Sequence, residues 1–334
     1  MSRSIGRRWR ALAAIGVLAL ILAACGEDTS GNNGAKGTGG GKQDAKLSGT
    51  ITVDGSSTVA PLTSTAAELF QQEHPDVRIT VGTSGTGGGF KKFCAGETDI
   101  ADASRPIKTD DEFEGQACER NGIAYEELQV ANDGIALIVN KNNDWAECLT
   151  VEQLKTIWEP AAQGRITNWN QVDPSFPDQK LTLFGAGTAS GTFDFFTKAI
   201  NGEEKASRSD YSATEEDNTT VQGVAGDKGA LGYLGLSYYE ENQDKLKVLK
   251  VDGGDGCVEP TTETVQDGSY TPLSRPLFIY VTDKLLQRPE GLAFVEFYLD
   301  NASDIAERAL FVPMTAEQTA ESRRKIQDLA KRFG

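Results

Sequence analysis

The sequence predicts an α/β fold of two lobes, and three observations lead to this prediction. Short apolar runs of strand length alternate with segments of helical spacing, which is typical of a mixed sheet flanked by helices. Without an N-terminal leader of 24 residues the chain has 334 − 24 = 310 residues, too many for one ordinary core and enough for two. The order of the segments predicts that the chain crosses between the lobes twice, which suits a hinge.

The first elements follow Leu47, where apolar residues begin to recur. A strand is expected at 49–53 and a helix at 59–72, because Pro61 fits the first turn of a helix. The apolar residues of this helix recur at helical spacing: Leu62, Ala66, Leu69 and Phe70. The next expected elements are a strand at 77–81, a short helix near 90–94 and a short strand at 99–103.

The second series begins with an apolar strand at 135–140. It continues with a helix at 151–157, a strand at 181–184, helices at 191–200 and 220–226, and a strand at 246–251. A strand at 277–282 and helices near 292–300 and 316–331 complete the chain. These elements predict a first lobe of residues 48–135 plus 270–334 and a second lobe of residues 136–269.

The N-terminus has the pattern of a secretory signal peptide. Four arginines precede an apolar run at 11–24, and small residues close it: Arg3, Arg7, Arg8 and Arg10, then Ala23 and Ala24. The alternative is a transmembrane anchor, but fourteen apolar residues are too few to cross about 30 Å of hydrocarbon. The segment up to Cys25 resembles the lipobox of bacterial lipoproteins. That resemblance implies cleavage after residue 24, lipid such as palmitate on Cys25, and a place on the outer face of the cell membrane.

Residues 25–47 are rich in Gly, Asn, Lys, Asp and Thr and predict a flexible tether, because so polar a stretch cannot offset its ordering entropy by burial. The chain carries a net charge of −16, which becomes −16 − 4 = −20 when the four leader arginines are removed. Such an acidic protein is a poor partner for nucleic acid and for a broad anionic surface. A small anion in a locally attractive pocket is still compatible with it.

Four cysteines remain after Cys25, and an even number in an exported protein predicts two disulfides. Of the three possible pairings, we favour Cys94–Cys118 and Cys148–Cys257, because each then stays within one expected lobe. A zinc site is the alternative. It is disfavoured because close C-x-x-C spacing is missing and His74 is the one histidine of the sequence. We expect no metal and no cofactor.

Three turns of similar composition each join an expected strand to an expected helix, at 55–59, 82–89 and 185–192. Each presents hydroxyls and bare backbone N–H groups at a helix N-terminus, which is a place where anions bind. Helix capping alone explains any one such turn. Three of them after strands favour a common ligand site, since ligands of open α/β sheets lie beyond the carboxyl ends of the strands. The spacing matches neither a P-loop nor a dinucleotide fingerprint.

At these turns the chain resembles the substrate-binding lipoproteins of bacterial phosphate ABC transporters. The resemblance covers the chain from about Leu47 to its end. It rests on four segments taken together: Gly55-Ser56-Ser57-Thr58-Val59-Ala60-Pro61, Gly85-Thr86-Gly87-Gly88-Gly89-Phe90, Asp99 to Ile107 with Ser104-Arg105-Pro106, and Ser190-Gly191-Thr192-Phe193-Asp194. It implies a type II periplasmic-binding-protein fold that closes on one inorganic phosphate. It also implies a monomeric receptor that serves the permease and ATPase subunits of an importer.

The resemblance also implies ligand residues. Carried over by position, the phosphate contacts are the Thr58 hydroxyl, the Val59 amide, Thr86 or its near alternative Ser84, and the donors of Ser190, Gly191 and Thr192. The chain departs from the best-known members at two positions: Arg105 replaces an aspartate, and Ala186 replaces an arginine. Arg105 is therefore expected to supply the missing guanidinium. The alternative is that it forms a structural salt bridge with Asp99 or Asp102.

The missing aspartate leaves the choice of oxyanion open. HPO₄²⁻ has a proton to donate and sulfate has none, so a buried carboxylate favours phosphate. The candidate acceptors are Asp54, Asp102 and Asp194. We expect a phosphate receptor that makes and breaks no bond. The alternatives are a receptor for sulfate, molybdate or a phosphate ester, or a secreted phosphatase, against which the single histidine speaks.

Overall fold

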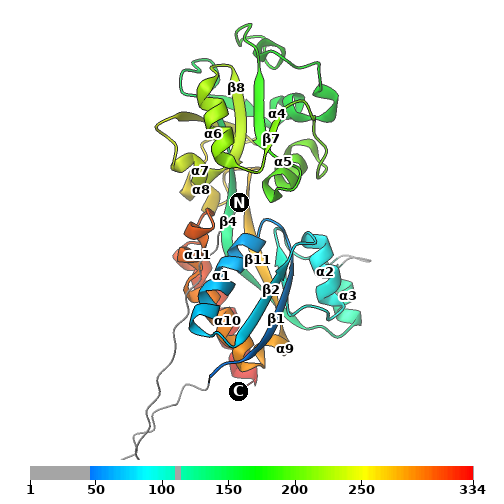
Figure 1. Ribbon diagram of the computed structural model, residues 1–334. Coiled ribbons are helices and arrows are strands. Elements are labelled where there is room, and N and C mark those ends of the chain that lie inside the picture. The colour runs from blue at the N-terminus through cyan, green and yellow to red at the C-terminus, as the bar shows by residue number, and fades with distance from the viewer. Residues whose placement is uncertain (1–45, 110–113, 334) are drawn as a thin grey trace, which may run out of the picture. The chain divides into compact units, whose positions relative to one another are not determined.

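The computed structural model describes residues 46–109 and 114–333 (Figure 1). The strands in this part of the chain are β1 (Gly49–Gly55), β2 (Val77–Gly82), β3 (Ile100–Ala103), β4 (Tyr125–Asn140), β5 (Cys148–Thr150), β6 (Thr182–Ala186), β7 (Ser212–Thr214), β8 (Ala230–Gly235), β9 (Leu246–Asp252), β10 (Cys257–Val258) and β11 (Ser274–Thr282).

The helices of the same residues are α1 (Ala60–Glu73), α2 (Thr86–Cys94), α3 (Glu114–Arg120), α4 (Val151–Trp158), α5 (Gly191–Asn201), α6 (Asp217–Gly226), α7 (Leu236–Glu240), α8 (Thr262–Gln266), α9 (Asp283–Leu286), α10 (Pro289–Asp300), α11 (Ala302–Arg308) and α12 (Ala316–Phe333). No helix among the described residues has both the length and the apolar character needed to span a bilayer.

Strand β4 is shared by the two lobes. The strand order is β2-β1-β3-β11-β4-β8-β6-β7, and β9 also pairs with β4. The first part of β4, Tyr125 to Gly134, pairs antiparallel with β11, and its last part pairs antiparallel with β8 from Ile135 onwards. One strand of 16 residues therefore joins the two halves of the sheet. The predicted two-lobed α/β fold is confirmed, while the lobe boundaries at 135 and 270 stay predictions.

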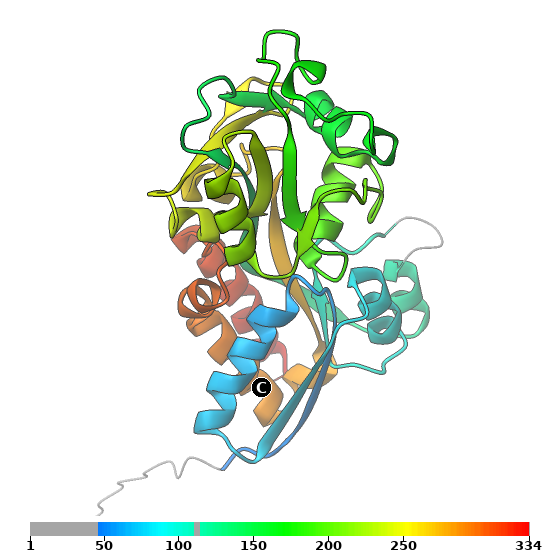
Figure 2. The same cartoon turned by 45° about the horizontal axis from the view of Figure 1, so that its top comes forward.

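Each lobe has its own apolar core. One core gathers around the second half of β4 with Trp158, Phe196 and Tyr233. The other gathers around β1, β3 and β11 with Phe70 and Phe294, and a smaller cluster adjoins it. Because side chains alternate across a strand, the first-lobe strands need cover on two faces. The helices α1, α10 and α11 pack together, and α2 packs with α3 elsewhere on these strands (Figures 1 and 2).

The structure corrects several expected elements. Strand β4 begins at Tyr125 rather than 135, because its polar first half is held by pairing with β11 rather than by an apolar face of its own. Strand β8 was not expected, since its glycines weaken the strand pattern. Helix α2 begins at Thr86 rather than near 90, because its glycines have low helix propensity but fit a first turn packed closely on β1.

Both expected disulfides are confirmed. Cys94–Cys118 joins α2 to α3, and Cys148–Cys257 joins β5 to β10. The first closes a separation of 24 residues and the second a separation of 109 residues. Since a disulfide restricts the unfolded chain more when the loop is longer, the second is expected to stabilise the protein more.

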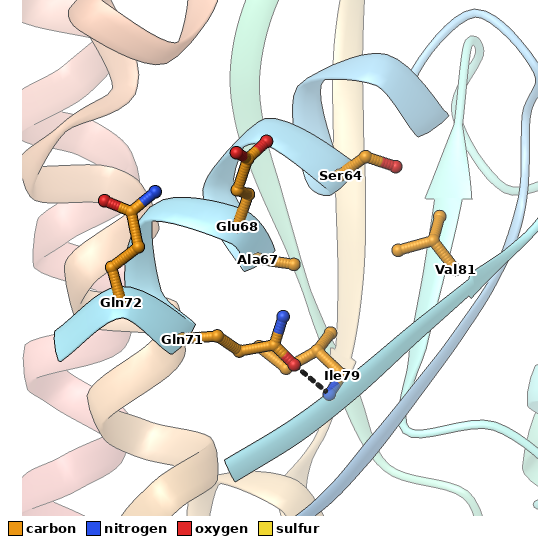
Figure 3. A pocket seen from close by; sticks show the side chains of 7 residues that line it. All are labelled: Ser64, Ala67, Glu68, Gln71, Gln72, Ile79 and Val81. Carbon is orange, nitrogen blue, oxygen red and sulfur yellow. Dashed lines mark hydrogen bonds between the residues drawn. The ribbon is translucent and has the colours of Figure 1, made fainter. Parts of the chain in front are cut away.

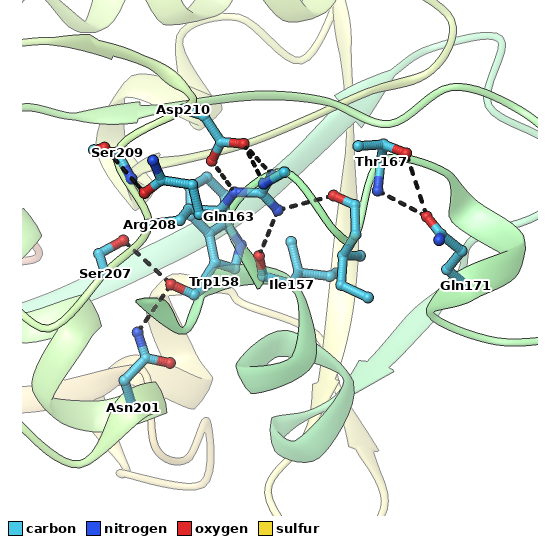
Figure 4. Close-up of polar contacts among 12 residues, drawn as sticks. Ile157, Trp158, Gln163, Thr167, Gln171, Asn201, Ser207, Arg208, Ser209 and Asp210 are labelled. Carbon is cyan, nitrogen blue, oxygen red and sulfur yellow. Dashed lines mark hydrogen bonds and ion pairs between the residues drawn. The ribbon is translucent and has the colours of Figure 1, made fainter. Parts of the chain in front are cut away.

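A buried arginine fixes the irregular part of the second lobe (Figure 4). The Arg208 side chain donates to both carboxylate oxygens of Asp210 at 2.6 and 2.8 Å. It also donates to the carbonyls of Ile157 and Ile166, both at 3.0 Å. These bonds hold the pKa of Asp210 down to about 2. Arg208 therefore ties the end of α4 and the segment that leads to β6 to the loop that carries Arg208 and Asp210.

Removing the disulfides one at a time tests the loop argument. The loop-entropy relation gives a loss of about 5 kcal/mol for the pair Cys148→Ala and Cys257→Ala, and about 3.5 kcal/mol for Cys94→Ala and Cys118→Ala. Urea unfolding of the two double variants, each with the other disulfide intact, measures the difference. Equal losses, or a larger loss at Cys94–Cys118, would contradict the loop-length argument.

Candidate functional site

The turn after β1 is held in place by a hydrogen bond to β3. The Ser56 amide donates to the carbonyl oxygen of Asp102 at 2.8 Å, and the Thr58 amide donates to Ser56 Oγ at 3.2 Å. Helix α1 starts directly afterwards, with Pro61 in its first turn. Thr58 is only 6% exposed, and the Val59 side chain is buried in the core. The turn therefore holds the Thr58 hydroxyl near the N-terminus of α1.

The second turn is bonded to the first. The Gly85 amide donates to the carbonyl oxygen of Gly55 at 2.8 Å. Gly85 has φ +78° in the left-handed region, where glycine is favoured. A Cβ built on Gly89 would overlap Gly55, so only glycine lets α2 approach β1 this closely. Ser84 and Thr86 are thereby held near the turn that carries Thr58.

The hydroxyls of the second turn have different partners. Ser84 donates through its amide and its hydroxyl to Asp54 Oδ1, and Lys92 Nζ lies 2.6 Å from Asp54 Oδ2. Burial alone would raise the pKa of Asp54, but the hydrogen bonds from Lys92 and Ser84 outweigh it and hold this pKa below its usual value. Thr86 Oγ1 lies 3.0 Å from the hydroxyl of Ser104. Asp54 is thus an ionised carboxylate that orients Ser84.

The third turn meets the first across the two lobes. Ser190 caps α5, and its hydroxyl accepts from the Thr192 amide at 3.1 Å. A Cβ built on Gly191 would overlap the hydroxyl and backbone of Thr58. The N-terminus of α5 therefore lies against the N-terminal turn of α1, and the structure brings Thr58, Ser190, Gly191 and Thr192 into one region.

The sequence reasoning missed Arg275, which lies at this meeting point. Its Nη2 donates to Thr58 Oγ1 at 3.1 Å, and its Nε and Nη2 donate to Asp133 Oδ2 at 3.1 and 3.0 Å. The guanidinium carbon lies 3.8 Å from the ring centroid of Phe195 on α5. Burial raises the pKa of Asp133 and lowers that of Arg275, and their mutual attraction opposes both shifts. The available signal was a charged residue two positions before the apolar run 277–282.

Arg105 has a carboxylate partner in the first lobe. Its Nη2 lies 2.7 Å from Glu114 Oε1, and its guanidinium carbon lies 5.5 Å from the Phe90 ring centroid. The expected alternative, a structural salt bridge, is therefore present, but its partner is Glu114 and not one of the suggested residues, Asp99 or Asp102. Asp99 pairs with Arg288 at 3.1 Å, and Asp102 accepts from Thr63. Arg105 follows Ser104, so it lies close in the chain to the Thr86 contact.

The three expected acceptor carboxylates have different surroundings. Asp54 is engaged by Ser84 and Lys92. Asp102 is 0% exposed and faces α1, with its pKa raised by burial to about 7. Asp194 lies in the first turn of α5, and its Oδ1 has no hydrogen-bond partner among the described residues. Lys205 Nζ lies 4.0 Å from this oxygen as an ion-pair partner. Burial raises the pKa of Asp194. Asp194 Oδ1 thus lies at the site and accepts no hydrogen bond from the described residues.

A hollow of about 520 Å³ lies elsewhere, between α1 and β2 (Figure 3). Its lining includes Glu68, Gln71 and Ile79, and the Gln71 side chain accepts from the Ile79 amide at 2.9 Å. None of the expected ligand residues lines it, so we assign no anion-binding role to it. In the described part of the chain no three His, Cys, Asp or Glu side chains are grouped so as to hold a metal ion.

Comparison with known proteins places the chain among binding proteins. A model of the PBP superfamily domain matches residues 40–302. Protein SphX of Synechocystis is 49% identical over 274 residues, which are 82% of this chain and 81% of SphX. The phosphate-binding protein PstS of Staphylococcus saprophyticus is 40% identical over 300 residues, which are 89% of this chain and 90% of PstS.

Two solved structures are similar as well. A possible phosphate binding protein from Planctomyces limnophilus is 47% identical with a TM-score of 0.80, over 85% of this chain and 99% of that chain. A putative phosphate ABC transporter substrate-binding protein from Clostridium perfringens, solved with bound phosphate, is 30% identical with a TM-score of 0.56. That similarity covers 80% of this chain and 100% of the other.

Proposed function

The chain belongs to the PBP superfamily, and from this premise we propose that it is an extracytoplasmic receptor that binds inorganic phosphate between its lobes and delivers it to an ABC importer. One observation carries the proposal: Gly191 and Arg275, from two distant parts of the chain, both contact Thr58, which lies in a third. The similarity to PstS and to the phosphate-bound Clostridium protein supports phosphate as the ligand.

The proposed binding chemistry uses aimed dipoles and one guanidinium. The hydroxyls of Thr58, Ser190 and Thr192 and the amides of Val59 and Gly191 are donors at the N-termini of α1 and α5. Arg275 adds two-pronged N–H donors suited to an oxyanion, and its charge is balanced by Asp133. Phosphate enters by separating α5 from the Thr58 turn and replaces the Thr58–Arg275 contact.

The remaining expected residues take secondary roles in this proposal. Ser84 and Thr86 add hydroxyls from the second turn, and Arg105 is the competing source of a guanidinium. Asp194 is the favoured acceptor for the proton of HPO₄²⁻, because its Oδ1 accepts no hydrogen bond from a described residue and it lies in the same helical turn as Gly191. A carboxylate there would be left unpaired and repelled by sulfate.

We propose that the protein acts by binding alone and as a monomer. The lobes, the shared strands and the hydroxyl-rich turns all serve capture and release. Its partners are the permease and ATPase subunits of the importer. The predicted leader, the tether and Cys25 lie outside the described residues. On the sequence pattern we propose that Cys25 carries lipid and holds the receptor at the outer face of the cell membrane.

Isothermal titration with phosphate and with sulfate tests the ligand. Phosphate should bind in the micromolar range or tighter, and sulfate should bind at least tenfold more weakly because it has no proton for Asp194. Tighter binding of sulfate or molybdate would favour another tetrahedral oxyanion. A protein that gives no heat with phosphate would sink the proposal. Release of phosphate from a chromogenic ester, lost in Ser190→Ala, would instead support a phosphatase.

Matched exchanges distinguish the two guanidinium groups. Arg275→Lys keeps the charge beside Asp133 but loses the two-pronged donor, so phosphate affinity should fall about tenfold or more, as expected for a charged hydrogen bond worth about 1.5–3 kcal/mol. The same exchange at Arg105 should change affinity less than about threefold. Titration calorimetry of both variants measures this. The reverse result would assign the ligand guanidinium to Arg105.

Membrane attachment depends on Cys25 in this proposal. Cys25→Ala should remove the lipid site and stop processing before residue 25, so the full chain should keep its leader and lose the mass of the acyl groups. Mass spectrometry of wild-type and variant protein from cell membranes measures both. Cys94→Ala with Cys118→Ala is the control, because it removes two cysteines without changing the N-terminus. An unlipidated wild-type chain would refute the anchor.

A further inference from the structure

A buried carboxyl lies directly beneath the first turn. Asp102 on β3 is 0% exposed, and its backbone carbonyl accepts from the Ser56 amide of that turn at 2.8 Å. A Cβ built on Gly55 would overlap this carbonyl, so the turn and Asp102 are locked together. The side chain points towards α1, where Thr63 Oγ1 donates to its Oδ1 at 2.8 Å. Asp102 is thus coupled to the proposed anion site without lining it.

Half of this carboxyl has no partner. Oδ2 is buried and makes no hydrogen bond to any described residue. The nearby Tyr298 hydroxyl lies 3.2 Å from Thr63 Oγ1 and forms its hydrogen bond with Thr63 rather than with Asp102 Oδ2. A buried carboxylate oxygen without a donor is costly, whereas a protonated carboxyl carries no charge to desolvate. The surroundings therefore favour the protonated form.

The groups that face Asp102 supply no opposing positive charge. Asp54 on β1 is a like charge, and its own cation, Lys92 on α2, is taken up by the Asp54 carboxylate. Tyr298 on α10 is a neutral hydroxyl, and Ile279 is the register partner of Asp102 on β11. Burial and the Asp54 charge together raise the pKa of Asp102 to about 7.

We propose that Asp102 is a proton-linked element of the anion site, which takes up a proton when an anion occupies the Thr58 turn and weakens binding when it ionises. The inference rests on the proposed function, since it requires an anion at that turn. A bound anion would add a second negative charge at the turn whose Ser56 amide is bonded to the Asp102 carbonyl, and like charges repel each other. Linkage is reciprocal, so whatever the anion does to the proton affinity, the proton does to the anion affinity.

The first arm of the test measures protons taken up on binding. Wild type, Asp102→Asn and the control Tyr298→Phe are titrated with inorganic phosphate at pH 6, 7 and 8.5, each in two buffers of different ionisation enthalpy. The ionisation of phosphate itself is common to all three proteins and cancels in their differences. Wild type and Tyr298→Phe should take up more protons at pH 7 than Asp102→Asn. At pH 8.5 Asp102→Asn should bind about fivefold or more tightly than wild type, and at pH 6 equally.

The second arm needs no ligand. A carboxyl whose pKa is higher in the folded than in the unfolded protein makes the folded state lose stability as pH rises from about 4 to about 7, with a plateau above. Wild type should therefore become less stable relative to Asp102→Asn across this range, as measured by urea unfolding. If the variant does not fold, the carboxyl titration of Asp102 in wild type, followed by ¹³C NMR with and without phosphate, gives the same quantity.

The two proposals fail differently. Absence of phosphate binding by the wild-type protein refutes the proposed function. If, in addition, the difference in unfolding free energy between wild type and Asp102→Asn does not change between pH 4 and 7, the linkage is refuted as well. Phosphate binding with equal proton uptake in wild type and Asp102→Asn refutes the linkage alone. A titration of Asp102 near its ordinary value, below pH 5, overturns it whatever the ligand does.

Discussion

The buried guanidinium of Arg275 is the interaction on which the rest of the site depends. A charge in this position is tolerated because the antiparallel register places Asp133 of β4 directly opposite it on β11. A slip of one residue between these strands would turn the pair to opposite faces. Once held there, the guanidinium reaches Thr58 in the first lobe and the ring of Phe195 in the second. The pairing of β4 with β11 therefore does more than build the sheet, because it holds the group that both lobes contact.

Close approach of backbones is the second constraint, and glycine provides it. Gly89 lets α2 rest on Gly55, and Gly191 lets α5 rest on Thr58. These contacts bring the N-termini of α2 and α5 against the end of β1 and the turn that follows it, in a chain of net charge −16. In the binding mode that we propose, attraction for an anion comes from short-range dipoles and Arg275 rather than from the overall field of the protein. That distinction explains why an acidic composition and an anion site are compatible.

The sequence predicted correctly those elements whose structure is determined by neighbouring residues in the chain. The turns at Thr58, Thr86 and Ser190 follow strands and start helices, as their composition predicted. The first half of β4 was missed because Glu127, Gln129, Asn132 and Asp133 interrupt its apolar pattern. Those residues are held by pairing with β11, and their partners lie 142 to 153 positions further along the chain. Arg275 was missed for the same reason, since nothing local shows that it will lie beside Thr58, 217 positions away.

The acidic residues around the site differ in one respect that bears on how an anion can bind there. Asp54 has Lys92 and Asp133 has Arg275, so each of these carboxylates lies beside its own cation and adds little net charge. Asp194 lies 4.0 Å from the ammonium group of Lys205. Asp102 accepts one hydrogen bond from a neutral hydroxyl, on one of its oxygens. It is made neutral most simply by a proton, and a buried aspartate beneath the turn is placed to hold one.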